Sequence, residues 1–135
     1  MISVILPTYN EAGNVAEAII RIYEALRGVR VPLEVLVMDD RSLDGTAQEA
    51  SRLSGTYPVR VHVRSGAREL GAAVLEGLGM ARGSICVVMD ADLSHPADMI
   101  PELIAPIVEG RSDMAVGSRT LREASASGGR RAAGS

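Results

Sequence analysis

The chain has 135 residues, a hydrophobic fraction of 47%, a charged fraction of 23% and a formal net charge of −3. This length and balance indicate one globular domain and argue against a disordered chain or a nucleic-acid-binding protein. All 14 basic residues are arginine, which excludes a mechanism that needs a catalytic lysine.

The first elements follow directly from the order of apolar residues. An apolar run at 2–6 predicts a buried strand. From Val15 to Leu26 the apolar residues recur at helical spacing, which predicts a helix with Asn14 and Glu17 as a capping pair.

The same alternation continues to residue 117. The predicted elements are, in order, a strand at 33–38, a short helix at 46–53, a strand at 59–63, a helix at 70–81 weakened by its glycines, a strand at 84–89, a helix at 98–109 and a strand at 113–117. Strands that alternate with helices predict βαβ units, and therefore an α/β fold with a mainly parallel sheet. The last 16 residues lack periodicity and predict a loop or a frayed end.

Several features bear on the compartment. No apolar run approaches the roughly 20 residues that a membrane-spanning helix needs. Pro7 and Asn10 stop the first apolar run, so we expect no signal peptide. The single cysteine, Cys86, lies in an apolar run and fits a buried strand residue in a reducing compartment. We therefore expect a cytoplasmic protein.

Acidic residues gather where the predicted strands end. In open parallel sheets, ligands bind beyond the carboxyl ends of the strands. Five carboxylates are expected at that edge: Glu11, Asp39, Asp40, Asp90 and Asp92. Packed carboxylates repel one another unless a cation or protons intervene. Their hard oxygen ligands suit Mg²⁺ or Mn²⁺ shared with substrate phosphates.

Asp90 and Asp92 are the candidate metal ligands. Residues i and i+2 of an extended segment point the same way, so both could reach one ion if the chain stays extended past its strand. A bound nucleotide diphosphate would supply further oxygens. A lone Asp-x-Asp also occurs as a turn or a helix cap, and that alternative stays open.

Other polar residues of this edge have competing interpretations. Asp44-Gly45-Thr46 is typical of turn and cap chemistry. His95 is more typical of a loop histidine than of a metal ligand. Tyr9 could pack against the protein or stack on a nucleobase.

Taken together, these segments are similar to the family 2 glycosyltransferases with the GT-A fold. They most resemble the dolichol-phosphate (polyprenyl-phosphate) mannosyltransferases. The resemblance covers residues 2–119 and rests on five segments, LPTYNEAGNV, VMDDRSLDGT, the Arg–Leu-Gly-Ala-Ala spacing of 64–73, MDADLSHP and GSR.

The resemblance implies a fold and a division of the chain. The fold would be a Rossmann-like three-layer sandwich with a mainly parallel sheet. Residues 1–119 would form the nucleotide-sugar-binding core. Residues 120–135 would be a flexible basic tail at the truncated start of the acceptor region. Family members continue well beyond this point, so the chain is expected to be a fragment or a naturally shortened copy.

The resemblance also implies site residues. The expected substrate contacts are Pro7, Tyr9, Glu11, Met38, Asp40, Asp90, Ala91, Asp92, Arg119 and Arg131. Within this set, Met38 and Asp40 would line the base and ribose pocket, and Asp90 and Asp92 would hold the metal and the diphosphate. Asp92 and Arg119 are the residues expected to act in catalysis.

Two positions depart from the family pattern. Arg41 replaces the usual glycine of a DDGS turn, although glycine permits backbone angles that arginine resists. Ser94 stands where some relatives carry a metal-binding glutamine.

The implied activity is transfer of a hexose with inversion. The donor would be GDP-mannose, the acceptor a polyprenyl (dolichyl) phosphate, and the cofactor Mg²⁺ or Mn²⁺. The protein would act peripherally at the cytoplasmic face of a membrane, with a possible membrane-anchoring partner. The alternatives are a related transferase that uses UDP-glucose and a truncated, non-catalytic nucleotide-sugar-binding fragment.

Two other nucleotide- or Mg²⁺-binding classes fit the residues less well. A receiver-type signalling domain places its acidic pair after the first strand and needs a lysine, whereas this chain places the pair after the second strand and contains no lysine. A nicotinamide-dependent reductase needs a glycine-rich turn after the first strand, and PTYNEAGN is not one.

Overall fold

A computed structural model describes residues 1–93, 97–102, 104 and 115–117. The strands are β1 (Ile2–Thr8), β2 (Leu33–Asp39), β3 (Val59–Val63), β4 (Ile85–Met89) and β5 (Ala115–Gly117). The helices are α1 (Val15–Ala25), α2 (Thr46–Ser51) and α3 (Leu70–Met80), with short 3₁₀ turns η1 (Arg52–Gly55) and η2 (Ala97–Met99). Much of the helix predicted at 98–109 and the tail at 120–135 lie outside the described residues.

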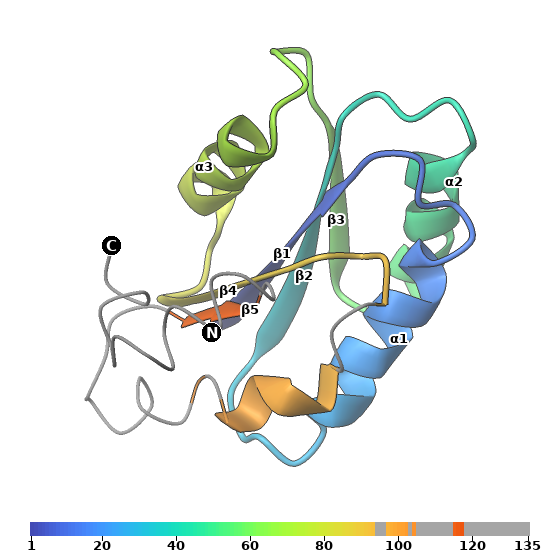
Figure 1. Cartoon of the computed structure of the whole chain (residues 1–135). Helices are drawn as coiled ribbons and strands as arrows, with labels where there is room; N and C mark the ends of the chain where they lie inside the picture. Colours follow the sequence, from blue (N-terminus) through green and yellow to red (C-terminus); the bar gives the residue numbers. More distant parts are fainter. Residues whose placement is uncertain (94–96, 103, 105–114, 118–135) are drawn as a thin grey trace.

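The sheet has the strand order β3-β2-β1-β4-β5, and every described pairing is parallel. Helices α1 and α2 cover one face, and α3 covers the other (Figure 1). The predicted three-layer α/β sandwich is therefore confirmed. Parallel strands place all their carboxyl ends at one edge, where the connections to the helices begin. No helix among the described residues is long and apolar enough to span a membrane.

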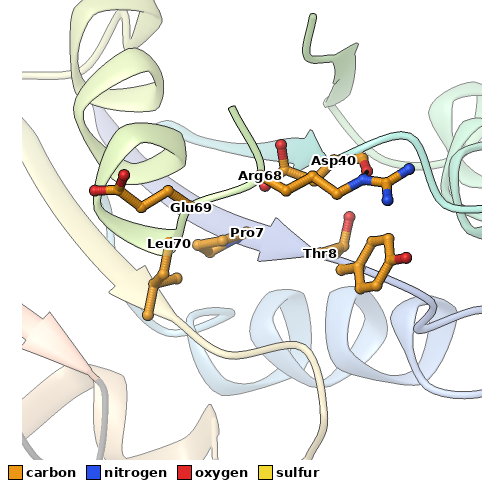
Figure 2. A pocket seen from close by; sticks show the side chains of 7 residues that line it. Pro7, Thr8, Asp40, Arg68, Glu69 and Leu70 are labelled. Carbon is orange, nitrogen blue, oxygen red and sulfur yellow. Dashed lines mark hydrogen bonds between the residues drawn. The ribbon is translucent and has the colours of Figure 1, made fainter. Parts of the chain in front are cut away.

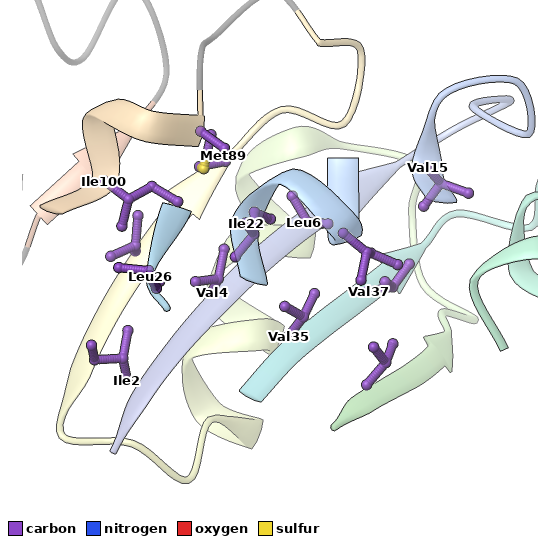
Figure 3. Close-up of a cluster of buried hydrophobic side chains, with 14 of the residues drawn as sticks. Ile2, Val4, Leu6, Val15, Ile22, Leu26, Val35, Val37, Met89 and Ile100 are labelled. Atoms are coloured by element: carbon purple, nitrogen blue, oxygen red, sulfur yellow. The ribbon is translucent and has the colours of Figure 1, made fainter. Parts of the chain in front are cut away.

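The core is built from branched aliphatic side chains on both faces of the sheet. Ile2, Val4 and Leu6 of β1 point toward α1 (Figure 3), whereas Ile5 packs on the opposite face. This alternation follows from the two-residue period of a strand. Because helices cover both faces, β1 reads as a continuous apolar run in the sequence.

The predicted capping pair of α1 is wrong. Asn14 stands at the N-cap position but makes no capping hydrogen bond through its side chain. Its Nδ2 donates instead to Oε2 of Glu11 at 3.1 Å. Glu17 pairs with Arg21 one turn further on, at 2.8 Å. The side chains of 11 and 14 thus bond within the loop that precedes α1.

A buried carboxylate, Glu34 of β2, connects β1, β3 and the segment before β4 near the amino edge of the sheet, opposite the carboxyl ends of the strands. It accepts hydrogen bonds from the Ser3 hydroxyl at 2.5 Å, the Arg82 backbone N–H at 2.8 Å and Arg60 Nε at 3.0 Å. Burial acts to raise the pKa of Glu34, but these hydrogen bonds outweigh it and hold the pKa below its ordinary value of 4.5.

Replacing Glu34 with glutamine is expected to lower the free energy of unfolding by about 2 kcal/mol at pH 7, because an amide N–H₂ would face these donors. A depressed pKa in the folded state contributes stability above pH 4.5, and this contribution is lost as the pH falls through the folded pKa. Urea unfolding should therefore show the deficit of Glu34→Gln shrinking below about pH 4. Glu24→Gln, on an exposed residue, is the control; an equal deficit there would contradict the prediction.

Gly77 lets α3 lie close to the sheet. A Cβ at this position would lie 2.7 Å from Cγ2 of Ile5 and 3.1 Å from Cγ of Met38, both of which are fully buried. A Cβ at Gly79, two residues further on, would meet nothing within 4 Å. The glycines that weaken the helix signal in the sequence therefore differ in role, and Gly77 is required by packing.

The two glycines provide a matched pair. Gly79→Ala is expected to stabilise the fold by about 0.5–1 kcal/mol, because alanine favours the helix and meets nothing. Gly77→Ala is expected to destabilise it by about 1–2 kcal/mol, since overpacking outweighs the same helix gain. Chemical unfolding of both variants checks the sign of each change. Stabilisation by Gly77→Ala would show that α3 can shift outward at little cost.

Candidate functional site

A cavity of about 300 Å³ opens at the carboxyl edge of the sheet. It lies between the ends of β1 and β2 and the segment that leads into α3 (Figure 2). Its lining residues are Pro7, Thr8, Tyr9, Asp40, Arg68, Glu69 and Leu70. The cavity thus occupies the place where open α/β sheets bind ligands.

Asp40 contributes a buried carboxylate to this cavity. Its Oδ1 pairs with Nη1 of Arg64, whose side chain is only 3% exposed. Arg64 Nε also donates to Oε1 of Glu76 at 2.9 Å, and Glu76 Oε2 lies 2.7 Å from Nε2 of His62. A chain of polar contacts therefore connects the end of β2 with β3 and α3.

These contacts shift two ionisation equilibria. Burial of the Arg64 guanidinium disfavours its charge, but its hydrogen bonds to Glu76 and Asp40 raise its pKa overall. The hydrogen bond from Arg64, with a smaller one from His62, holds the pKa of Glu76 below its ordinary value. Both shifts favour the charged forms, and the charged Arg64 guanidinium pairs with the Asp40 carboxylate.

Arg68 crosses the mouth of the cavity. Its guanidinium carbon lies 4.9 Å from the centre of the Tyr9 ring, within range of a cation–π contact. Its Nε donates to the backbone carbonyl of Asp40 at 3.1 Å. An otherwise exposed arginine is thereby held against two different loops.

The loops after β1 and β2 are joined by hydrogen bonds. The backbone N–H of Asn10 donates to Ser42 Oγ at 2.7 Å, and Asn10 Oδ1 accepts from the backbone N–H of Leu43 at 3.1 Å. The N–H of Glu11 donates to the hydroxyl of Thr46 at 2.8 Å. The first loop therefore takes its shape from side chains of the second.

Asp39 does not belong to the acidic rim. It is 1% exposed and accepts hydrogen bonds from Thr8 Oγ1 at 2.7 Å and from Ser42 Oγ and N–H at 2.6 and 2.9 Å. The expectation of five carboxylates facing a ligand is thus wrong for Asp39, because its carboxylate faces inward and stabilises the turn.

Asp44 and Thr46 perform the turn and cap chemistry that the sequence indicates. Asp44 Oδ1 accepts from the hydroxyl and the backbone N–H of Thr46 at 2.5 and 3.1 Å. Asp44 Oδ2 accepts from the backbone N–H of Ala12 at 3.1 Å. The hydroxyl of Thr46 is the largest of the interactions that hold the pKa of Asp44 below its ordinary value.

Beyond β4 the chain turns. Asp90 is half-buried, Ala91 is buried and Asp92 is exposed. Residues 91–92 form a turn, and Leu93 has a positive φ of 65°. The extended geometry expected for the two aspartates is therefore replaced by a turn. Within the described ranges no group of three or more His, Cys, Asp or Glu side chains could hold a metal ion by itself.

Residues 3–133 match the family described as Glycosyl transferase family 2. The chain belongs to this family.

Similar family 2 proteins include named mannosyltransferases. The chain is 47% identical over 121 residues to a dolichol-phosphate mannosyltransferase from Pyrococcus furiosus, with 90% of this chain and 34% of that protein covered. It is 42% identical to a polyprenol monophosphomannose synthase from Mycolicibacterium smegmatis, with 86% and 44% covered. The chain thus spans between about a third and a half of the length of these relatives.

A solved structure of a mannosyltransferase from Pyrobaculum calidifontis, in complex with GDP-Man and Mn²⁺, is also similar. It has a TM-score of 0.61 and 36% sequence identity, and the match covers 73% of this chain and 29% of that one. These likenesses agree with the family and with its GT-A fold.

Only some of the expected family 2 site residues line the cavity. Pro7, Tyr9 and Asp40 line the cavity together. Glu11 does not line it and hydrogen-bonds to Asn14 instead. Met38 is fully buried beneath α3 and does not line the cavity.

The remaining expected residues either follow β4 or lie outside the described part of the chain. Asp90, Ala91 and Asp92 follow β4 and do not line this cavity. Arg119, Arg131, Ser94 and His95 lie outside the described residues.

Four cavity residues were missed by the sequence reasoning: Thr8, Arg68, Glu69 and Leu70. Arg68 and Glu69 lie between β3 and α3, and Leu70 is the first residue of α3. The family resemblance includes this segment, but no strand-end argument singles it out. The spacing from Arg64 to Ala73 was the available signal, since a shared pattern in a loop points to function more than to packing.

Arg41 adopts the backbone angle that the usual glycine would favour. Its φ is 59°, in the left-handed region. Its Nη1 donates to the backbone carbonyl of Arg64 at 2.7 Å. This hydrogen bond offsets part of the strain that a side chain meets at this φ.

Arg41→Gly and Arg41→Ala separate the two effects. Both remove the hydrogen bond, but only glycine relieves the strain, so Arg41→Gly is expected to be more stable than Arg41→Ala by about 1 kcal/mol. Urea unfolding of the two variants measures the difference. Equal stabilities, or a more stable alanine variant, would mean that the turn is not strained at this residue.

Proposed function

We propose that this domain binds GDP-mannose and serves transfer of its mannosyl group to a polyprenyl phosphate with inversion. The observation that carries the proposal is the cavity at the ends of β1 and β2, in a family 2 domain whose similar relatives are named dolichol-phosphate or polyprenol mannosyltransferases. The similar solved structure in complex with GDP-Man and Mn²⁺ supports the choice of donor.

The donor set at the end of β4 suits a hard divalent cation. Asp90 and Asp92 supply oxygen ligands on one short turn, and the other ligands would come from the donor diphosphate and water. A bound Mg²⁺ or Mn²⁺ would neutralise negative charge on the leaving diphosphate. Asp92, which is exposed, would hold the ion from the solvent side, with Arg119 as a further contact to the donor.

The acceptor phosphate is anionic at neutral pH, so the transfer requires no general base. The domain has to align the acceptor oxygen behind the anomeric carbon and to stabilise charge on the departing group. In-line displacement inverts the configuration. Because the acceptor is a lipid, the protein would act at a membrane surface. We propose the cytoplasmic face, with help from an anchoring partner.

A second candidate is nucleotide-sugar binding without transfer. It is supported by the cavity at the ends of β1 and β2, because binding alone needs only a donor site. A UDP-glucose-using relative of the same family would share the cavity and differ in base selection.

Calorimetric titration with GDP-mannose, GDP and UDP-glucose, with and without Mn²⁺, tests the proposal. Guanine nucleotides are expected to bind more tightly with Mn²⁺, and Asp92→Ala should weaken this binding at least about tenfold because a metal ligand is lost. Glu24→Ala removes an exposed carboxylate elsewhere on the chain and should change nothing.

Equal affinity with and without Mn²⁺ would contradict the role of Asp90 and Asp92. On the same protein, mannosyl transfer from GDP-mannose to a polyprenyl phosphate in detergent, followed by mass spectrometry, separates the two candidates. Binding with no transferred product would favour the second.

A further inference from the structure

Arg68 is held more firmly than an exposed loop arginine needs to be. Its Nε donates to the carbonyl of Asp40, its Nη2 lies 3.5 Å from the carbonyl oxygen of Arg41, and its guanidinium carbon lies over the ring of Tyr9. Ordering a long side chain in this way costs conformational entropy. The contacts within the protein offset this cost before any ligand binds. A ligand would therefore meet a guanidinium that is already ordered.

One edge of the Arg68 guanidinium makes no contact with the described residues. The contacts of Arg68 within the described part of the chain use Nε, Nη2 and the ring face. The Arg68 side chain lines the cavity together with Asp40 (Figure 2), and the terminal edge of its guanidinium carries Nη1. It can donate two parallel hydrogen bonds to a ligand with two adjacent acceptors.

The strand order indicates which part of a nucleotide sugar Arg68 would meet. Arg68 lies against the loop after β2, whereas Asp90 and Asp92 follow β4, and β1 separates the two strands. Strands about 4.8 Å apart put these two positions roughly 10 Å from each other at the sheet edge. With the diphosphate at Asp90 and Asp92, the nucleobase falls on the Arg68 side.

We propose that Arg68 is a specificity-determining residue that selects guanine by donating hydrogen bonds to its O6 and N7 atoms. This inference rests on the proposed function and names the base that the same site selects. Guanine presents O6 and N7 as neighbouring acceptors, which match an arginine fork. Adenine carries an N6 amino group, a donor, in place of O6. Its complex would lack the hydrogen bond to O6, and the adenine amino group would face an N–H of Arg68.

Asp40 complements Arg68 from the other side of the base. Its carboxylate accepts from Arg64 through Oδ1 and is a potential acceptor for guanine N1–H and the N2 amino group. Arg68 would therefore bind the O6 and N7 edge of guanine, and Asp40 would bind the N1 and N2 edge. Inosine diphosphate shares O6 and N7 with GDP but lacks the N2 amino group, so it isolates the contribution of Arg68.

The test is calorimetry of GDP, inosine diphosphate and ADP, all with Mn²⁺, against the wild-type chain and Arg68→Met. Methionine keeps an unbranched side chain but removes every N–H donor. GDP and inosine diphosphate are expected to bind about tenfold more weakly to Arg68→Met, while ADP binds equally to both proteins. Arg27→Met, on an exposed arginine after α1, should leave all three affinities unchanged.

The ratio of GDP to ADP affinity decides the outcome, because it cancels any general effect of the lost charge on the diphosphate. An equal loss for all three nucleotides, or no loss for any, would overturn the inference while leaving the proposed function intact. Failure of the wild-type chain to bind any of the three would overturn both. Thermal unfolding of each variant confirms that folded proteins are compared.

Discussion

The site depends on how the backbone N–H groups after β1 find acceptors. Beyond the strand these groups leave the sheet ladder, and a buried or partly buried N–H without an acceptor is costly. Here the acceptors are side-chain oxygens of the loop after β2 and of the first residue of α2: Ser42 for Asn10, Asp44 for Ala12 and Thr46 for Glu11. Tyr9 of the cavity wall, which directly precedes Asn10, therefore depends on the folding of the loop after β2.

This constraint also divides the acidic residues into two groups. The sequence predicts several carboxylates along the carboxyl edge of the sheet, and their mutual repulsion argues for a bound cation there. The structure neutralises most of that repulsion internally, because Asp39 is hydrogen-bonded to Thr8 and Ser42 and Asp40 is paired with Arg64. The electrostatic argument for a metal consequently rests on the turn that carries Asp90 and Asp92, and not on the number of acids.

The fold could be predicted because its signals are local, whereas the site depends on side-chain direction. Apolar runs such as 2–6 and 33–38 specify strands buried on both faces, and the intervening periodicity specifies helices. Adjacent aspartates at 39 and 40 carry no such signal. One turns inward to the Ser42 hydroxyl and the other toward Arg64, which lies 24 residues further on. Arg68 escaped prediction for the same reason, since its partner carbonyl is 28 residues away.

The glycine of α3 shows how packing reaches the site. Gly77 allows the helix to approach Ile5 and Met38, which a β-carbon would prevent. The neighbouring Glu76 is thereby brought within 2.9 Å of Arg64, and Arg64 in turn pairs with Asp40. A helix displaced outward would move Glu76 away from Arg64 and leave a buried guanidinium with one carboxylate partner fewer. Close packing of α3 on the sheet therefore stabilises the core and also fixes the Asp40 wall of the cavity.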